Sequence, residues 1–495
     1  MGDRWWRMPK VGVVGGMTLL FLLACRGSGP SPDPAPQTSA EPVVSTLQER
    51  FGAWPFLELI DSPDAIDIAG QSMKVRAANC GSCHTDVYRE WQGSTHANAI
   101  NDLQYLAELS KGSSPRWLCL NCHIPLADQR AYRVTLDTEI IDRGEYDIGG
   151  LVKQPNPDFR PELVQEAITC ATCHVRADAQ GDAYIVGPRG AEGAPHAVQQ
   201  NREALHDICE RCHSPGTMSL TPLFFCWFET GTEAGGQDCA GCHMPEVERP
   251  VAVGAQPRIT RSHQWLGGGV PKSYEAYERL SALGWKPGVA TEIGEVRPGE
   301  QGPVLPITLS TADSAHDVPT ADPERHLLVK VTLLRGGESL SEHRTRLGQT
   351  WDWGDEGTGR PAKRIADRRL VAGSPVELLI PVPRWADADQ LRVEVLHVKL
   401  STSNLEHMAK VELPAEVSAL APGFSKRLPE MAKHYPIASY VYRGSRTLPD
   451  GEWEVDTVDQ LIAASVAAQG FDAAQRADWV RSNEGSPPPR RIDLP

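Results

Sequence analysis

Residues 80–84 read Cys80-Gly81-Ser82-Cys83-His84: two cysteines three positions apart, with a histidine directly after the second. The same pentad begins again at residues 119, 170, 209 and 239 of this 495-residue chain and takes up ten of its 12 cysteines. Positions i, i+3 and i+4 of a helical turn share one face, so two thiols and one imidazole can act on one bound group. The five copies therefore predict five sites of the same kind.

The pentad is typical of covalent heme c, in which the two thiols bond the vinyl groups and the imidazole binds the iron. Zinc would need paired units that supply four ligands, and a thioredoxin-like site needs one such pair in a βαβ context. Disulfides do not explain the five histidines. We therefore predict five hemes, attached through Cys80, Cys83, Cys119, Cys122, Cys170, Cys173, Cys209, Cys212, Cys239 and Cys242, with proximal ligands His84, His123, His174, His213 and His243.

The chain resembles the multiheme c-type cytochromes, a superfamily that includes the tetraheme electron carriers of ammonia oxidisers and the octaheme hydroxylamine oxidoreductases. The resemblance is carried by the pentads, by Tyr88, Trp91, Ser94 and His96 after the first, and by Cys242-His243-Met244-Pro245. The stretch Ala315–Thr320 resembles the end of the heme region in lipoprotein members. No pentad has lysine in place of histidine, the substitution that marks the catalytic heme of pentaheme nitrite reductases.

Ten further histidines are available as second axial ligands, whereas the 8 methionines show no systematic pattern. We therefore expect bis-histidine ligation at most hemes. The resemblance implies distal roles for His96, His263 and His316. His196, in a loop, and His206, which would have to serve a neighbouring heme, complete the predicted set. The remaining histidines are predicted to be surface or β-domain residues: His326, His343, His397, His407 and His434.

The N-terminal residues have the pattern of an export signal. Arg4, Arg7 and Lys10 precede an uncharged run, Val11–Ala24, that is too short to span a bilayer, and Cys25 follows Leu22-Leu23-Ala24 as in a bacterial lipobox. We predict a signal peptide over 1–24, lipidation of Cys25 and a Pro/Ser-rich tether over 25–48. An ordinary signal peptide with an incidental cysteine is the alternative. The expected location is the periplasmic or outer-membrane surface of a Gram-negative bacterium.

The residue composition and the pattern of apolar residues along the chain predict an α+β multidomain protein. With 44 glycines, 40 prolines and only 6% aromatic residues, packed hemes must replace much of the usual core. The predicted order is a mostly helical, loop-rich pentaheme domain (49–265), a linker with a helix (266–302), a small antiparallel β-sandwich (303–445), and a C-terminal helix and tail (446–495). Alternating, β-branched runs predict strands over 305–310, 327–334, 376–382, 391–400 and 439–442.

Function follows from the cofactors and the charge. A formal net charge of −15 argues against nucleic acid as a partner. We expect electron transfer through closely spaced hemes, redox partner proteins with a basic docking surface, and a membrane contact through the lipid anchor. One alternative is an oxidoreductase that acts on a small nitrogen or sulfur compound at a five-coordinate heme. Another is a subunit of a cytochrome filament.

Overall fold

The structure is a computed structural model that describes residues 59–110, 116–136, 151–190, 193–213, 239–267, 269–312, 314–320, 322, 324–352 and 363–469. The predicted signal peptide, Cys25, the tether and the C-terminal tail lie outside these ranges. Within them, no helix combines the length and apolar character that a bilayer crossing requires.

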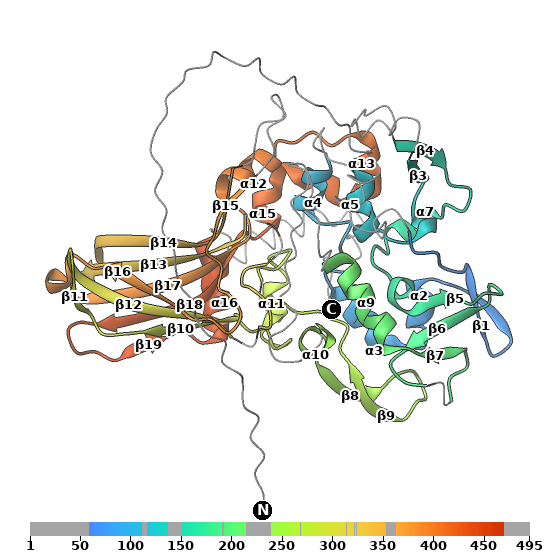
Figure 1. Cartoon of the computed structure of the whole chain (residues 1–495), viewed down its shortest axis with the longest axis horizontal. Coiled ribbons are helices and arrows are strands. Elements are labelled where there is room, and N and C mark those ends of the chain that lie inside the picture. Colours follow the sequence, from blue (N-terminus) through green and yellow to red (C-terminus); the bar gives the residue numbers. More distant parts are fainter. Residues whose placement is uncertain are drawn as a thin grey trace, which may run out of the picture. The chain divides into compact units, whose positions relative to one another are not determined.

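The motif-bearing part of the chain consists of short helices, loops and small hairpins (Figure 1). Its helices are α2 (Ala77–Gly81), α3 (Thr85–Gly93), α4 (Leu103–Leu109), α5 (Arg116–His123), η1 (Ala127–Gln129), α7 (Pro161–Val164), α8 (Cys170–His174), α9 (Arg202–His213) and α10 (Cys239–His243). Its strands are β1 (Ala65–Ile68), β2 (Gln71–Lys74), β3 (Tyr132–Leu136), β4 (Leu151–Pro155), β5 (Val175–Ala177), β6 (Ala183–Gly187), β7 (Val198–Gln200), β8 (Glu246–Pro250) and β9 (Pro257–Arg261).

These strands qualify the predicted fold class. The α+β class is confirmed, but the expectation of a mostly helical heme region is not, because β1–β2, β3–β4, β5–β6–β7 and β8–β9 each form a small sheet. Strands of three to five residues carry too little periodicity to be recognised from sequence. They have a structural role, since loops and ends of these hairpins present backbone carbonyls to the motif histidines.

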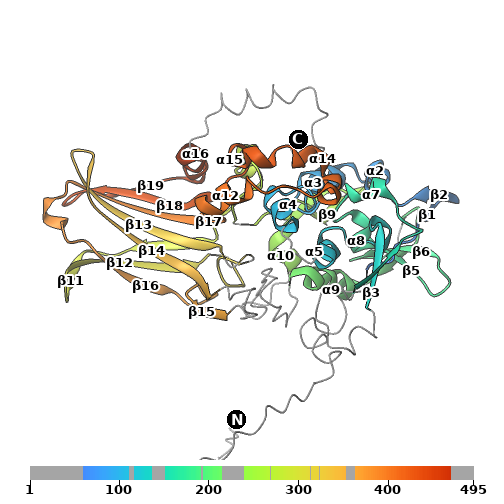
Figure 2. The same cartoon turned by 90° about the horizontal axis from the view of Figure 1, so that it is seen from above.

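The C-terminal part contains two sheets packed face to face (Figures 1 and 2). One has the order β10 (Val289–Ile293), β12 (Gly302–Thr311), β11 (Arg297–Gly299), with β16 (Val376–Pro381) also paired to β12. The other has the order β15 (Lys363–Asp367), β14 (Glu338–Asp352), β13 (His326–Arg335), β17 (Gln390–Val398), β18 (Ala438–Thr447), β19 (Trp453–Val455). Alternate residues of both sheets, including Ile307, Val329 and Val393, are fully buried between them. The sequence therefore predicts the sandwich but not its bounds, because β10, β11 and β19 lie outside 303–445.

The five predicted strands coincide with β12, β13, β16, β17 and β18, whereas the longest strand, β14, was missed. Its sequence is dominated by charged and polar residues because most of its side chains stay accessible, and its register comes from backbone pairing with β13. Gly336 and Gly337 join the two strands, and both have positive φ (58° and 83°), as a two-residue hairpin turn requires.

A helical insertion interrupts the sandwich between β17 and β18. It comprises α12 (Thr402–Met408), α13 (Ala415–Leu420), α14 (Pro422–Ser425), η4 (Leu428–Glu430) and α15 (Met431–His434). Leu405, Phe424 and Met431 from this insertion share a buried core with Leu106 and Leu109 of α4. The insertion therefore ties the C-terminal part of the chain to the heme region.

Two further helices and one short 3-10 turn complete the described part. The helix predicted within the linker (266–302) is α11 (Tyr277–Leu280), and the helix predicted within the C-terminal segment (446–495) is α16 (Val458–Ala468). Thr457 and Gln460 form a capping box that starts α16. The turn η3 (Trp385–Asp387) lies between β16 and β17. Tyr277 and Leu280 pack with residues of α16 in a separate small core.

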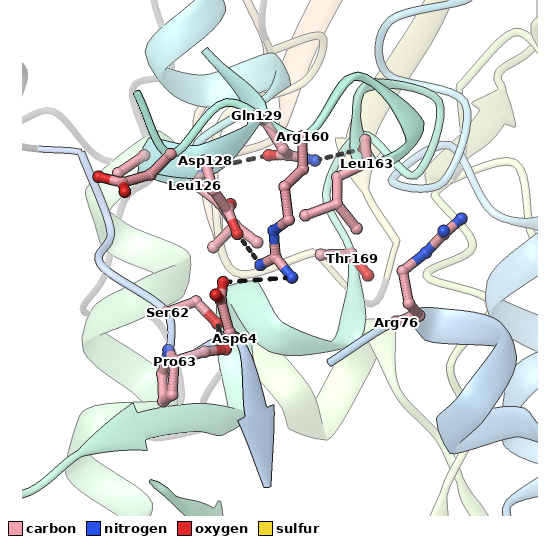
Figure 3. A network of polar contacts seen from close by, with 12 residues as sticks. Ser62, Pro63, Asp64, Arg76, Leu126, Asp128, Gln129, Arg160, Leu163 and Thr169 are labelled. Carbon is pink, nitrogen blue, oxygen red and sulfur yellow. Dashed lines mark hydrogen bonds and ion pairs between the residues drawn. The ribbon is translucent and has the colours of Figure 1, made fainter. Parts of the chain in front are cut away.

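Buried polar residues fix the segment that leads into the third motif (Figure 3). The Gln129 amide donates to the carbonyls of Leu163 (2.9 Å) and Ala167 (2.8 Å), and its side-chain oxygen accepts from the Leu126 amide (3.0 Å). Nearby, the Arg160 guanidinium pairs with the Asp128 carboxylate. Since these groups are buried, each hydrogen bond offsets the cost of removing a polar group from water. The bonds therefore favour a single backbone conformation for the chain that leads into the third motif.

Glu166 links the first and third motifs. Its Oε2 accepts from the backbone amide of Ala77, at the start of α2 (2.9 Å), and from the Thr169 hydroxyl, directly before α8 (3.0 Å). Its Oε1 accepts from Arg76 (2.8 Å). A buried carboxylate at a helix N-terminus satisfies a free N–H and interacts well with the helix dipole. One side chain thus holds two motif helices together.

Candidate heme-binding site

Each pentad forms a helical turn, as the spacing predicts. The third and fifth pentads are the helices α8 and α10, and the second and fourth end α5 and α9. At the first, the His84 amide donates to the Cys80 carbonyl (2.9 Å), which is an i to i−4 helical bond. The two cysteines and the histidine of each pentad consequently lie on the same side of the turn.

All five pentads open into one cavity of about 2990 Å³. Sites for a single drug-sized ligand hold roughly 300–1,000 Å³, so this cavity has room for several large groups. The predicted attachment cysteines and the predicted proximal and distal histidines all line it. Exposed apolar side chains such as Val253 and Ile259 also line it, and they suit an apolar macrocycle. Among the described residues, no three His, Cys, Asp or Glu side chains converge to hold a bare metal ion.

Backbone carbonyls fix the tautomer of four proximal imidazoles. Nδ1 lies 2.6–3.1 Å from the carbonyl oxygen of Val251 for His84, of Ala99 for His123, of Val186 for His174 and of Leu266 for His243. A carbonyl can only accept, so Nδ1 carries the proton and donates. The lone pair of Nε2 is then directed away from the backbone, which is the form that binds iron.

Four of the proximal imidazoles face a second imidazole. The ring centroids are 6.3 Å apart for His84 and His196, 5.9 Å for His213 and His96, 6.2 Å for His174 and His263, and 6.3 Å for His243 and His316. These four partners are all predicted distal ligands. The structure therefore brings together residues that are far apart in the sequence.

The spacing of these pairs fits a shared metal ion. A metal–imidazole bond is about 2.0–2.1 Å, and a ring centroid lies roughly 1.1 Å from its nitrogen, so two imidazoles on one ion have centroids about 6 Å apart. Two imidazoles in direct stacking contact would be much closer. Nδ1 of His263 and of His316 also hydrogen-bonds a carbonyl oxygen, that of Arg261 (2.9 Å) and that of Asp317 (3.0 Å), which again leaves Nε2 as the ligand atom.

Burial favours the neutral form of three of the cavity histidines, His96, His123 and His263. Burial lowers the pKa of His96 to about 3 and that of His263 to about 3, with a smaller contribution from neighbouring histidines. Burial likewise lowers the pKa of His123 to about 4. A neutral imidazole has a lone pair for a metal, so the site does not need to release a proton before ligation.

His123, the proximal residue of the second pentad, has a different neighbour. Its ring stacks on Tyr105 with centroids 3.5 Å apart and planes within 1°. All 15 histidines belong to the described residues, and none of them forms a ring pair with His123. Although burial alone would raise it, the Lys272 and Lys399 ammonium groups lower the pKa of the neighbouring Asp102 carboxyl, so the surroundings of this motif are strongly polar.

The fifth predicted distal ligand, His206, is not brought to His123. It lies on α9, the same continuous helix that carries Cys209 and His213. The helix holds His206 about two turns from His213, on the wall of the cavity beside its own motif. Because the helix fixes this separation, His206 cannot face His213 across the iron of its own motif.

Two histidines outside the predicted ligand set also line the cavity. His397 on β17 and His434 on α15 are buried, with exposed fractions of 6% and 4%. His397 is a β-domain residue, as predicted, whereas His434 belongs to the helical insertion that packs on α4. No local pattern in the sequence indicates that this insertion turns back to the heme region. His326, His343 and His407 lie on β13, β14 and α12.

Sequence comparisons with known proteins agree with the motifs. Residues 79–142 match the family model "Cytochrome c554 and c-prime". The C-type polyheme cytochrome OmcC of Geobacter sulfurreducens is 28% identical over 170 residues, which are 32% of this chain and 20% of that protein. The chain thus matches about a fifth of that relative's length. A penta-heme cytochrome c552 from Thermochromatium tepidum aligns over 76% of this chain and 99% of that structure, with a TM-score of 0.47 and 18% identity.

Five CxxCH turns in one cavity, paired imidazoles and the similarity to polyheme cytochromes define the class: the chain is a multiheme c-type cytochrome. The predicted heme sites are called hemes 1 to 5 in the order of their pentads. When bound, the heme irons supply reversible one-electron chemistry, while the protein supplies axial ligands, burial and spacing.

Proposed function

We propose that the protein conducts electrons through five covalent hemes, of which hemes 1, 3, 4 and 5 have two histidine ligands each. The observation that carries this proposal is the set of four imidazole pairs at the spacing of a shared iron. Iron with two strong axial ligands has no free position for substrate, and its geometry changes little with oxidation state, so it suits electron transfer.

Contacts between motifs support an order for the hemes. The neighbouring Cys170 thiol lowers the pKa of Cys80, so the attachment points of hemes 1 and 3 lie close together. The Cys122 thiol likewise lowers the pKa of Cys212, so the attachment points of hemes 2 and 4 lie close together. Cys173 lies in the electrostatic field of Cys209 and Cys212, which connects hemes 3 and 4. The resulting path runs from heme 1 through hemes 3 and 4.

Heme 4 is a branch point in this order. His213 and His123 influence each other electrostatically, and so do His213 and His243. Heme 4 therefore has hemes 2, 3 and 5 as neighbours. A branched arrangement allows electrons to be stored on one arm while another arm exchanges them with a partner.

We also propose export, a lipid anchor at Cys25 at the periplasmic or outer-membrane surface, and redox partners with a basic docking face. The lipobox-like sequence and the net charge of −15 support these proposals. Replacement of Cys25 by serine should release heme-loaded protein from the membrane fraction. Retention of this variant after a salt wash would contradict the anchor.

Heme stoichiometry tests the main proposal. The intact mass of protein matured in a heme-attaching periplasm should correspond to five hemes, and the hemes should remain attached after denaturation. Low-temperature EPR of the ferric protein should show four low-spin hemes with paired imidazoles. Fewer than four low-spin hemes in freshly matured protein would contradict the ligand assignment.

The geometry at His123 favours a second function for heme 2: an oxidoreductase site with an open axial position. Tyr105 packs on the proximal ring, and no histidine lies opposite it. The polar neighbours Asp102 and Lys272 form an ion pair at this part of the cavity, which suits a small polar nitrogen or sulfur compound better than an apolar one.

The two functions of heme 2 are separated by ligand binding. If heme 2 is open, about one heme in five should be high-spin, and reduced protein should bind one carbon monoxide per chain. Replacement of Cys119 and Cys122 by serine should remove both signals and leave four low-spin hemes. Five low-spin hemes without carbon monoxide binding would show that heme 2 is also only a carrier.

A further inference from the structure

The segment Arg261–Leu266 contacts the ligands of three hemes. His263 faces the proximal imidazole of heme 3, His174, with ring centroids 6.2 Å apart. The Leu266 carbonyl accepts from Nδ1 of His243, the proximal ligand of heme 5 (3.1 Å). Between these two residues, Trp265 reaches His96, which is paired with the proximal ligand of heme 4.

Trp265 makes edge-to-face contacts with two distal imidazoles at once. Its ring centroid lies 4.5 Å from that of His96 with an interplanar angle of 66°, and 5.2 Å from that of His263 with an angle of 82°. Edge-to-face aromatic pairs are favourable at such distances, and a ring held in this way hinders rotation of its neighbour. One indole therefore limits the rotation of the distal ligands of hemes 3 and 4.

The backbone at Trp265 is held in an unfavourable conformation. Its φ of +47° places it in the left-handed region, which bulky residues rarely adopt because it strains the backbone. Two of the next residues, Gly267 and Gly268, would adopt this conformation without strain. Strain of this kind persists where surrounding contacts determine the backbone position. Here the Trp265 ring contacts the imidazoles of His96 and His263, and the carbonyl of the next residue, Leu266, accepts from His243.

We propose that Trp265 is a positioning residue that sets the orientation of the distal imidazoles of hemes 3 and 4 together and thereby matches the reduction potentials of these two adjacent hemes. The orientation and hydrogen bonding of axial ligands are among the means by which a protein tunes heme iron. The inference rests on the bis-histidine ligation proposed above. It adds a residue that is not itself a ligand and that couples two hemes.

The experiment compares three substitutions in the heme-loaded full chain. Trp265→Gly and Trp265→Asn remove the ring but tolerate a positive φ, and Trp265→Phe keeps an aromatic ring at the same place. EPR of the ferric protein reports the mutual orientation of paired imidazoles, and a potentiometric titration reports the midpoints. Both ring-deleted variants should shift the signals and midpoints of two hemes and leave the remaining low-spin hemes unchanged, while the phenylalanine variant should lie between them and wild type.

Trp91→Phe is the matched control. Trp91 belongs to the same small cluster as Trp265, but its ring contacts Tyr88, and its indole N–H donates to the Ile168 carbonyl (2.8 Å). This control should leave the signals of hemes 3 and 4 in place. If Trp91→Phe shifts the signals of hemes 3 and 4 as much as Trp265→Phe does, the shifts reflect a general loss of packing in this cluster, and the proposal is overturned.

The other possible results of the Trp265 substitutions also test the proposal. Unchanged EPR signals and midpoints in Trp265→Gly, with all hemes attached, would overturn the proposal. If the ring-deleted variants do not mature, Trp265→Phe alone decides, because a phenyl ring is too small to keep both contacts and must shift at least one signal. Failure of the underlying ligation would be visible separately, as missing bis-histidine signals in the wild-type protein.

Discussion

The imidazole of His316 lies across from that of His243, with ring centroids 6.3 Å apart and planes within 8°. His243 ends α10 in the heme region, whereas His316 follows β12 of the sandwich. The Asp317 carbonyl orients His316, and the Asp317 carboxylate pairs with Arg369 from the segment after β15. The sandwich thus supplies and braces a residue of the heme 5 site.

Replacement of His316 by alanine should free one axial position without removing any attachment cysteine. We expect one additional high-spin heme relative to wild type, a shift in one midpoint potential and an unchanged heme content. Optical spectroscopy, EPR and intact mass measure these quantities. His343→Ala, on β14, is the control and should alter none of them. An unchanged low-spin count in His316→Ala would refute the ligand role.

Glu90 holds the backbone of His263, the distal ligand proposed for heme 3. Its carboxylate accepts two hydrogen bonds from Arg249 (2.6 and 2.9 Å) and one from the His263 amide (2.8 Å). Glu90→Ala leaves a buried guanidinium without its partner, so the variant should lose about 3 kcal/mol of stability and show a lower Tm. The exposed Glu248→Ala on β8 should change stability by at most about 0.5 kcal/mol. Equal effects of the two substitutions would argue against a role for the buried pair.

Gln129 is predicted to be intolerant of an apolar replacement. Gln129→Leu preserves the approximate volume but leaves the Leu163 and Ala167 carbonyls and the Leu126 amide without a buried partner. Each such group costs about 1–3 kcal/mol, so the total loss should be about 3 kcal/mol or more. Thermal unfolding measures it. Gln200→Leu, at an exposed position, is the control, and a loss below about 1 kcal/mol in Gln129→Leu would be inconsistent with the network.

Asp322 should make stability depend on pH. Burial raises its pKa to about 6, above its unfolded value of 3.8, so the folded state binds more protons between these values. Stability should therefore fall as pH rises from about 4 to 6, with a cost of roughly 3 kcal/mol above that range. Asp322→Asn cannot ionise, and its Tm relative to wild type should rise between pH 4 and pH 8. A difference that is independent of pH would contradict this assignment.

Local patterns predict the part of the site that lies within the pentads, namely the ten cysteines and the five proximal histidines, whereas the resemblance to multiheme cytochromes implies distal roles for His96, His263 and His316. The structure places each of these three, and the loop residue His196, opposite a proximal imidazole. Strands such as β13 and β17 alternate cleanly because one face is buried in the sandwich. The short strands of the heme region and the polar β14 lacked such a signal, and packing or backbone pairing with distant segments forms them instead.

The sequence by itself determined the chemistry of attachment, because two thiols and an imidazole on one helical turn depend only on residues within that turn. Only the tertiary structure decided which imidazole faces which. His96 pairs with His213, and His243 with His316, across segments that nothing in the local sequence relates. The tertiary structure also placed His123 beside Tyr105, and Trp265 between His96 and His263. Such pairings depend on long-range packing of helices, hairpins and the sandwich, which no local periodicity encodes.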